Sequence, residues 1–220
     1  MEITSGIFGA LGRFCMSFNT AEVDRLLDYL EEAYHFDRTV FLFGNGGSAA
    51  TASHLCEDLG KGTLKSKNET KRLRIISLTD NTPYILAWAN DEGYETIFEQ
   101  QLRNLARPGD LAIGISGSGN SKNVLRAVEY ADAAGLVTIG MTGFDGGQLR
   151  NMVDHCVHVP IFEMGMVECM HMIIGHYLVN SLRQRLHQFA APEVTVVDNV
   201  ELRRTLAPHL IPAPAVAALE

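Results

Sequence analysis

Residues 109–124 read GDLAIGISGSGNSKNV, and this stretch decides the fold class. A continuous apolar run at 111–115 ends in a loop of glycines and serines. Apolar residues at helical spacing follow over 121–134 and stop at Gly135. A short apolar run without alternation is typical of a strand that is buried on both faces of a parallel sheet. The stretch therefore predicts a strand, a tight loop and a helix in succession.

The same succession of a buried strand and a helix recurs along the chain. Strands that alternate with helices predict a parallel sheet with helices on both faces. We therefore expect an α/β fold, a three-layer α/β/α sandwich around a five-stranded parallel sheet in the flavodoxin-like order 2-1-3-4-5. The predicted strands lie at 39–43, 74–78, 111–115, 136–141 and 156–160, and the clearest helices at 20–36, 121–134 and 163–186.

The composition is that of an acidic globular protein. The chain has 220 residues, of which 46% are hydrophobic and 20% charged, and its net charge is −8. Such a surface repels nucleic-acid phosphates, so no nucleic-acid partner is expected. No run approaches the ~20 apolar residues of a membrane span, and no basic targeting segment stands out. The four cysteines lack CxxC spacing. We therefore expect a cytoplasmic protein with reduced, mostly buried thiols and no membrane partner.

The end of the chain differs from the rest in composition. Residues 188–220 hold four of the seven prolines and finish in an Ala/Pro-rich tail. We expect residues 1–187 to form one domain with an N-terminal helix. Residues 188–220 are predicted to be a partly irregular extension, with a short strand at 193–197.

Two Gly/Ser loops follow neighbouring strands of the predicted sheet. GNGGSAATASH at 44–54 follows the first strand, and SGSGNSKN at 116–123 follows the third. In a sheet of this order, ligands bind beyond the carboxyl ends of the strands where the order reverses. Serine hydroxyls and backbone N–H groups at a helix N-terminus favour an anion. Local N-capping would explain one such loop, but two neighbouring loops favour phosphate, and no nucleotide motif is present.

Histidines and carboxylates follow helical spacing at two places. His54 and Asp58 are four residues apart, so one helix face carries both, where they could share a metal or a substrate proton. An ordinary surface pair is the alternative. On the late helix, Glu168 and His171 have a one-face metal spacing, and His176 follows. The alternative there is a hydrogen-bonded histidine within a methionine-rich core.

Together these motifs resemble the sugar isomerase (SIS) domain family and, within it, the phosphoheptose isomerases. The resemblance covers about residues 20–186. Its most specific parts are GNGGSA with the following His and Asp at 44–58, WANDEGYETIF at 88–98, GDLAIGISGSGNSKNV at 109–124, and ExxHxxxxH at 168–176. It implies a five-stranded parallel α/β/α sandwich and a homo-oligomer, a dimer or tetramer, with sites at subunit borders.

The resemblance also implies roles for individual residues. Phosphate would be held by Ser116, Gly117, Ser118 and Ser121, and the rest of the sugar phosphate by Asn45, Gly46, Gly47, Ser48, Asn90, Asp91 and Glu168. The family metal, usually zinc, would be held by His54, Asp58, Glu168 and His176, of which Asp58 and His176 would also be catalytic. The family carries a glutamate where this chain has Asp58 and a glutamine where it has Glu168.

Both departures have physical consequences. Asp58 is one methylene shorter than the family's glutamate, and proton transfer needs heavy atoms within about 2.6–3.2 Å. Glu168 adds a negative charge, which makes a bound metal a weaker Lewis acid. Glu168 and His176 are also about 12 Å apart along a straight helix at 1.5 Å per residue. A shared metal therefore requires a bend in that helix or ligands from two subunits.

The resemblance implies an aldose–ketose isomerase that converts sedoheptulose 7-phosphate into a heptose 7-phosphate through an enediolate. Asp58 or Glu168 would take the proton alpha to the carbonyl, while a metal or His176 stabilises the enediolate oxygen. The phosphate loop would fix the reacting carbons in place. Two alternatives remain, because fold does not imply function. One is a non-catalytic SIS-domain regulator that binds a sugar phosphate or a replication initiator, and the other is an isomerase of another sugar phosphate.

Overall fold

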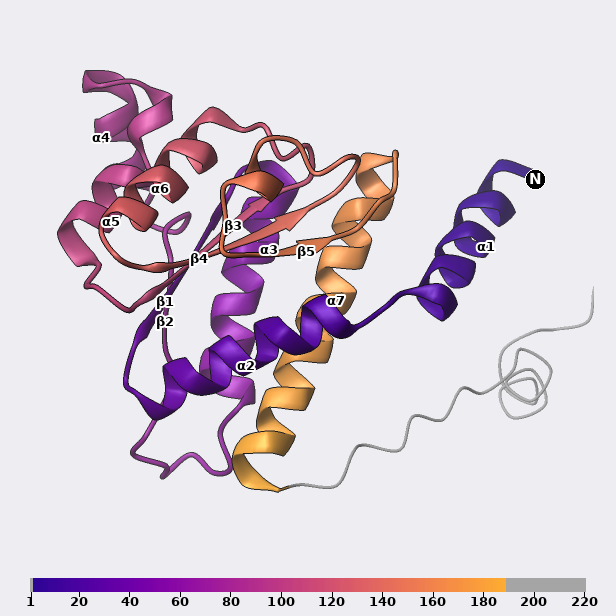
Figure 1. Cartoon of the computed structure of the whole chain (residues 1–220), viewed down its shortest axis with the longest axis horizontal. Coiled ribbons are helices and arrows are strands. Elements are labelled where there is room, and N and C mark those ends of the chain that lie inside the picture. Colours follow the sequence, from indigo (N-terminus) through magenta and orange to yellow (C-terminus); the bar gives the residue numbers. More distant parts are fainter. Residues whose placement is uncertain (1, 189–220) are drawn as a thin grey trace, which may run out of the picture. The chain divides into compact units, whose positions relative to one another are not determined.

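The computed structural model describes residues 2–188 of the chain. The strand predicted at 193–197 and, apart from residue 188, the predicted extension lie outside the described residues. Figure 1 shows a twisted sheet between layers of helices. Its strands are β1 (Thr39–Gly44), β2 (Arg74–Ser77), β3 (Leu111–Ser116), β4 (Val137–Thr142) and β5 (His155–His158). Neighbouring strands pair in parallel in the order β2-β1-β3-β4-β5, which confirms the predicted fold class and strand order.

The described residues contain seven α-helices, of which α1 projects away from the sheet (Figure 1). They are α1 (Glu2–Ser17), α2 (Ala21–His35), α3 (Gly46–Glu57), α4 (Thr82–Asp91), α5 (Glu99–Leu105), α6 (Lys122–Ala133) and α7 (Met164–His187). The predicted helices correspond to α2, α6 and α7. The short helix α4 was not predicted: it has no fully buried residue, and its contacts with the core are made by the partly buried Ile85, Trp88 and Ala89. Its start is nevertheless marked by Asn81, whose side chain accepts a hydrogen bond from the Tyr84 N–H, and by Pro83 in the first turn.

The side chains of β1 alternate between two hydrophobic cores, one on each face of the sheet. Val40 and Leu42 pack with residues of α2, α3 and α7. Phe41 and Phe43 pack with residues of α5 and α6. Each of these side chains contributes about 1.5–3 kcal/mol of hydrophobic stabilisation when fully buried. Burial on both faces explains why the sequence of β1 is an uninterrupted apolar run.

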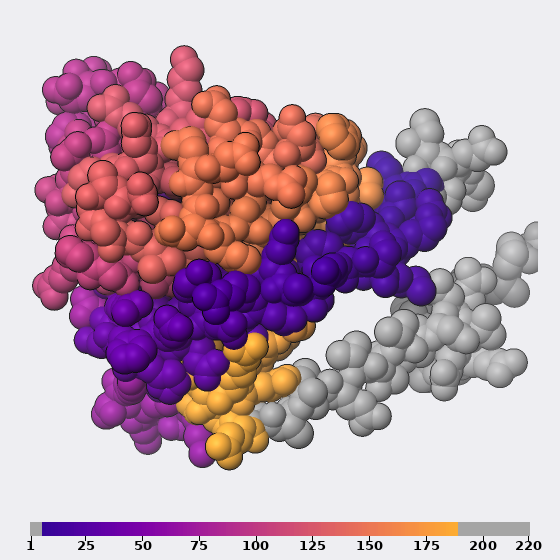
Figure 2. Space-filling model, in the orientation of Figure 1, coloured from indigo at the N-terminus to yellow at the C-terminus, as the bar shows by residue number. Residues whose placement is uncertain are grey.

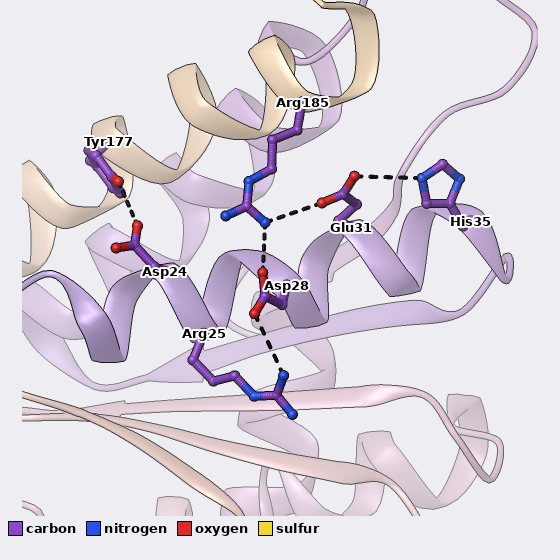
Figure 3. A network of polar contacts seen from close by, with 7 residues as sticks. All are labelled: Asp24, Arg25, Asp28, Glu31, His35, Tyr177 and Arg185. Atoms are coloured by element: carbon purple, nitrogen blue, oxygen red, sulfur yellow. Dashed lines mark hydrogen bonds and ion pairs between the residues drawn. The ribbon is translucent and has the colours of Figure 1, made fainter.

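Helices α2 and α7 are joined by polar contacts as well as by the core. The Tyr177 hydroxyl donates to Asp24 Oδ1 at 2.6 Å, and Arg185 Nη1 lies 2.7 Å from Asp28 Oδ1 and 3.2 Å from Glu31 Oε2 (Figure 3). Figure 2 shows the N-terminal helices, in indigo, crossing this face of the molecule next to the yellow end of α7. The contacts hold α7 in one orientation relative to α2.

The four cysteines are free, but none is buried. Cys15 and Cys169 are exposed, and Cys56 and Cys156 are half-buried. The expectation of mostly buried thiols is therefore wrong, because Cys169 lies on the face of α7 that points away from the core. Burial raises the pKa of the Cys56 and Cys156 thiols. None of the helices described over residues 2–188 is long and apolar enough to span a bilayer.

Candidate active site

The loops that follow β1 and β3 meet at the edge of the sheet, as predicted. Their contact is a reciprocal pair of side-chain amides. Asn45 Nδ2 donates to Asn123 Oδ1 at 2.8 Å, and Asn123 Nδ2 donates back to Asn45 Oδ1 at 2.9 Å. Asn45 stands directly before α3, and Asn123 lies in the first turn of α6. Because β1 and β3 are neighbours, both helices start at the position where ligands bind in sheets of this order.

The loop at 116–121 has the features of an anion site. The Ser116 hydroxyl donates to Ser121 Oγ at 3.2 Å, and the Gly119 N–H donates to the Ser116 carbonyl oxygen at 2.9 Å. Ser121 is the N-cap residue of α6, yet its side chain makes no capping hydrogen bond to the helix. Simple N-capping therefore does not account for this loop. Its hydroxyls lie at the positively polarised end of α6, which favours phosphate.

Glycine is required at Gly119 by both conformation and space. Its φ is +64°, and a Cβ atom there would overlap the carbonyl oxygen of Gly146. The loop can therefore pass close to the backbone that follows β4. Ser118 contributes a half-buried hydroxyl on the same turn, where its Oγ accepts from the Asn120 N–H at 3.3 Å.

Three of the four predicted metal ligands lie together. His54 Nε2 is 3.2 Å and His176 Nδ1 is 3.4 Å from the same oxygen, Oδ2 of Asp58. One ligand atom from each residue lies within 4.8 Å of the others. The two imidazole rings are edge to face, with centroids 5.2 Å apart. Three donors of this kind could hold a divalent ion and leave a position open for substrate.

Glu168 is not part of this cluster. Its carboxylate lies against Gly47 at the start of α3, where a Cβ atom on Gly47 would overlap it. Helix α7 runs without interruption from Met164 to His187, so no bend brings Glu168 to His176. The four-ligand set within one chain is therefore corrected to three residues. The position of Glu168 is favourable in itself, because a helix N-terminus stabilises a negative charge by about 0.3–1 kcal/mol.

His171, the second histidine of the late helix, is a core residue. It is 1% exposed, and its Nε2 lies 3.2 Å from the Thr142 carbonyl oxygen. Its Nδ1 has no hydrogen-bond partner among the described residues. Burial lowers the pKa of His171 to about 4, so the ring is neutral at physiological pH. The metal pair considered for Glu168 and His171 is therefore not supported.

The predicted substrate residues Asn90 and Asp91 lie at the end of α4. Both are exposed, and Asn90 Nδ2 donates to Asp91 Oδ1 at 2.8 Å. That hydrogen bond does not connect them to either Gly/Ser loop. Of the residues predicted in the first loop, Gly46 and Gly47 are exposed and Ser48 is buried in the first turn of α3.

Two residues of the site were missed in the sequence. The Tyr94 hydroxyl donates to Asn45 Oδ1 at 2.8 Å, and Asn123 is 2% exposed. With the two loops they line a crevice of about 290 Å³, whose residues are Asn45, Tyr94, Glu95, Ser121, Lys122 and Asn123. No signal in the sequence pointed to Asn123, because its burial and its contact with Asn45 appear only in the structure.

A groove of about 930 Å³ lies over α5 and α6. It is larger than the crevice at the two loops, but we do not assign it as the active site. Three of its charged residues form one ion-pair cluster: Arg103 and Arg126 both contact the buried carboxylate of Glu99. Burial alone would raise the pKa of Glu99, but the hydrogen bonds and positive charges of Arg103 and Arg126 hold it below its usual value. The groove therefore carries a structural ion-pair cluster, and we place the chemistry at the two Gly/Ser loops.

Comparison with known proteins identifies the family of the chain. The SIS domain family matches residues 11–143. The phosphoheptose isomerase of Aquifex aeolicus is 43% identical over 139 residues, which are 63% of this chain and 71% of that protein. The phosphoheptose isomerase of Geotalea daltonii is 40% identical over 165 residues, 75% of this chain and 84% of that protein.

A solved structure agrees as well. The phosphoheptose isomerase of Neisseria gonorrhoeae superimposes with a TM-score of 0.75 at 28% identity, over 82% of this chain and 97% of that one. Sequence and structure thus agree over most of the described residues. The chain belongs to the SIS domain family and, within it, to the phosphoheptose isomerases.

Proposed function

We propose that this chain is an aldose–ketose isomerase that converts sedoheptulose 7-phosphate into a heptose 7-phosphate through an enediolate. One observation supports this most directly: α3 starts at the crevice between the two loops and carries His54, and Asp58 follows directly at its end, where both residues meet His176 of α7. A phosphate anchor and a proton-transfer group thus belong to neighbouring elements. That is the arrangement needed to hold a sugar by one end and react at the other.

Asp58 is the proposed general base. Its Oδ2 faces both imidazoles, so a proton taken from the substrate would remain within a network that contains His176. His176, which is exposed, could return a proton to the neighbouring carbon or oxygen. Asp58 is also the first residue of a π-helical turn, Asp58–Gly62, a feature frequently found at functional sites. This turn could adjust the reach of the shorter side chain.

A divalent metal, zinc by family resemblance, would be held by His54, Asp58 and His176. The residues present suit such an ion, because two imidazoles and a carboxylate are common ligands in catalytic zinc sites. The metal would supply positive charge for the enediolate oxygen.

We also propose that the enzyme is a homo-oligomer whose sites include residues of a neighbouring subunit. Helix α4 has no fully buried residue in its own chain, and Leu86 on it is 61% exposed. Asn90 and Asp91 end this helix, so a partner subunit's crevice is a natural place for them. Ile85 and Trp88 of α4 pack against the core of the same chain, whereas the exposed side chain of Leu86 offers an apolar contact for a partner subunit.

The proposal is tested with purified protein, Zn²⁺ and sedoheptulose 7-phosphate. We expect turnover by the wild type and a loss of about 10²–10⁴-fold in kcat for Asp58→Asn, because the general base is removed. Ser118→Ala is expected to raise KM more than it lowers kcat. Glu57→Gln is the matched control, since this neighbouring carboxylate pairs with Lys61 on the surface and its loss should leave the rate unchanged.

The two alternative functions give different results in the same assay. Absence of turnover with the metal site shown to be filled would overturn the isomerase proposal. Thermal stabilisation by the sugar phosphate without turnover would then identify a binding protein. Stabilisation and turnover with a different sugar phosphate would instead identify an isomerase of another substrate.

A further inference from the structure

Almost all of the hydrogen-bonding capacity of the Asn45 side chain is satisfied within the protein. Its Oδ1 accepts hydrogen bonds from the Tyr94 hydroxyl at 2.8 Å and from Asn123 Nδ2 at 2.9 Å. A carboxamide oxygen has two lone pairs, so no acceptor capacity remains. Its Nδ2 donates to Asn123 Oδ1 at 2.8 Å, which leaves one N–H for a ligand. Asn45 is therefore held in place before any substrate arrives.

Asn123 is held even more firmly. Its Oδ1 accepts from the Val124 N–H at 3.0 Å as well as from Asn45 Nδ2, so this oxygen is also saturated. The residue is 2% exposed and lies inside the first turn of α6. A buried amide whose hydrogen bonds are satisfied has a single favourable orientation. Asn123 thus transmits the position of α6 directly to Asn45.

The two asparagines stand at matching points of the two ligand loops. Asn123 follows Ser121, the last serine of the phosphate loop, by two residues. Asn45 immediately precedes α3, the helix that carries His54 and ends beside Asp58. The amide pair therefore fixes the separation between the phosphate anchor and the proton-transfer cluster. That separation determines which carbon of a phosphorylated sugar reaches Asp58.

We propose that Asn123 is a positioning residue that sets the sugar chain length accepted by the site. Tyr94 supports this role by donating a hydrogen bond to Asn45, the partner of Asn123. This inference rests on the proposed function. Neither residue needs to touch the reacting atoms, and Tyr94 is 55% exposed at the rim of the crevice. A purely structural amide pair would affect folding alone. A positioning pair also affects how the sugar is held relative to its phosphate.

The test uses the full-length enzyme and compares two ligands, inorganic phosphate and sedoheptulose 7-phosphate. For Asn123→Ala we expect the inhibition constant of inorganic phosphate to change by less than about 3-fold, because the serines of the loop remain. We expect kcat for the seven-carbon substrate to fall by about 100-fold, the loss associated with a misplacement of about 1 Å. The ratio of kcat/KM for seven-carbon over five-carbon ketose phosphates should decrease.

Two further variants keep the test decisive if Asn123→Ala folds poorly. Tyr94→Phe removes a single hydroxyl and should lower kcat in the same direction, by about 3–10-fold at the strength of one hydrogen bond. Asn123→Asp keeps the two acceptor contacts but turns a buried carboxylate oxygen toward Asn45 Oδ1, so its kcat should fall at least as far as that of Asn123→Ala. Asn104→Ala, an exposed asparagine that contacts Tyr84 on the outer face, is the control for a lost amide.

The outcomes separate this inference from the function on which it rests. If the wild type neither binds nor turns over the sugar phosphate, both the proposed function and the positioning role are overturned. If the wild type is active, equal losses for seven- and five-carbon substrates would overturn the positioning role alone. Inorganic phosphate affinity that falls in parallel with kcat would do the same, because the pair would then merely support the phosphate loop.

Discussion

At the scale of single residues, His171 limits the pH range in which the fold is stable. Its ring is buried in α7, and burial lowers its pKa from 6.5 to about 4. The unfolded chain takes up a proton on this ring below pH 6.5, whereas the folded chain stays neutral until about pH 4. The unfolded state therefore binds more protons in this window, and stability falls as the pH drops through it.

The variant His171→Gln tests this directly. A glutamine can still donate to the Thr142 carbonyl oxygen but cannot titrate. Between pH 7 and pH 4.5 we expect the free energy of unfolding of the wild type to fall by about 2–3 kcal/mol more than that of the variant, since each pKa unit corresponds to about 1.4 kcal/mol. Urea unfolding at both pH values measures the difference. Parallel pH dependences would show that the ring charges freely in the folded protein.

At the scale of secondary structure, the hydrophobic pattern predicted the elements that bury two faces or a continuous stripe. Strands β1, β3 and β4 and helices α2, α6 and α7 are of this kind, whereas the edge strands β2 and β5 are only partly buried. Helix α4 was not predicted, because no residue of it is fully buried and its contacts with the core are made by the partly buried Ile85, Trp88 and Ala89. Side-chain orientation was also beyond the sequence: the ExxHxxxxH motif placed Glu168 and His176 on one helix, but only the structure shows that Glu168 faces Gly47. Asn123 was overlooked since its partner, Asn45, is distant in sequence.

The contact between α2 and α7 offers a second test of an element-level interaction (Figure 3). The Arg185 guanidinium holds the pKa of Asp28 below its usual value. The pair therefore stabilises the fold above the ordinary carboxyl pKa, and this contribution is lost as the pH falls through the lowered value. Both side chains are partly exposed, so we expect Arg185→Met to cost no more than about 1 kcal/mol at neutral pH and low salt.

The cost of Arg185→Met should shrink in high salt, because screening weakens partly exposed pairs. Chemical unfolding at two salt concentrations measures it. The matched control is Lys61→Met, which breaks the exposed pair with Glu57 and should change stability little. A loss for Arg185→Met that is independent of salt would assign the contribution of Arg185 to packing of its aliphatic stem against α2.

At the scale of the whole molecule, the oligomer proposed above would complete the proposed site with residues of a second chain. The loops and the His54–Asp58–His176 cluster come from one chain, whereas the predicted substrate residues Asn90 and Asp91 extend outward on α4. Which chain supplies them to a given crevice cannot be read from one sequence, because the family motifs are identical in every subunit. In the proposed oligomer, each α4 contributes its last residues to the crevice of a neighbouring subunit.

Subunit mixing tests whether α4 serves the crevice of a neighbouring subunit. Asp58→Asn removes the base, and Asp91→Ala removes the residue at the end of α4, so each variant alone should be inactive. In a mixed assembly, the crevice with an intact Asp58 can receive an intact α4 from the other variant. Co-refolding equal amounts should therefore restore a substantial fraction of wild-type kcat, and size-exclusion chromatography with light scattering would show the assembly. If Asp91 instead served its own chain, every subunit of the mixture would still carry one defect in its own crevice, and no activity would return.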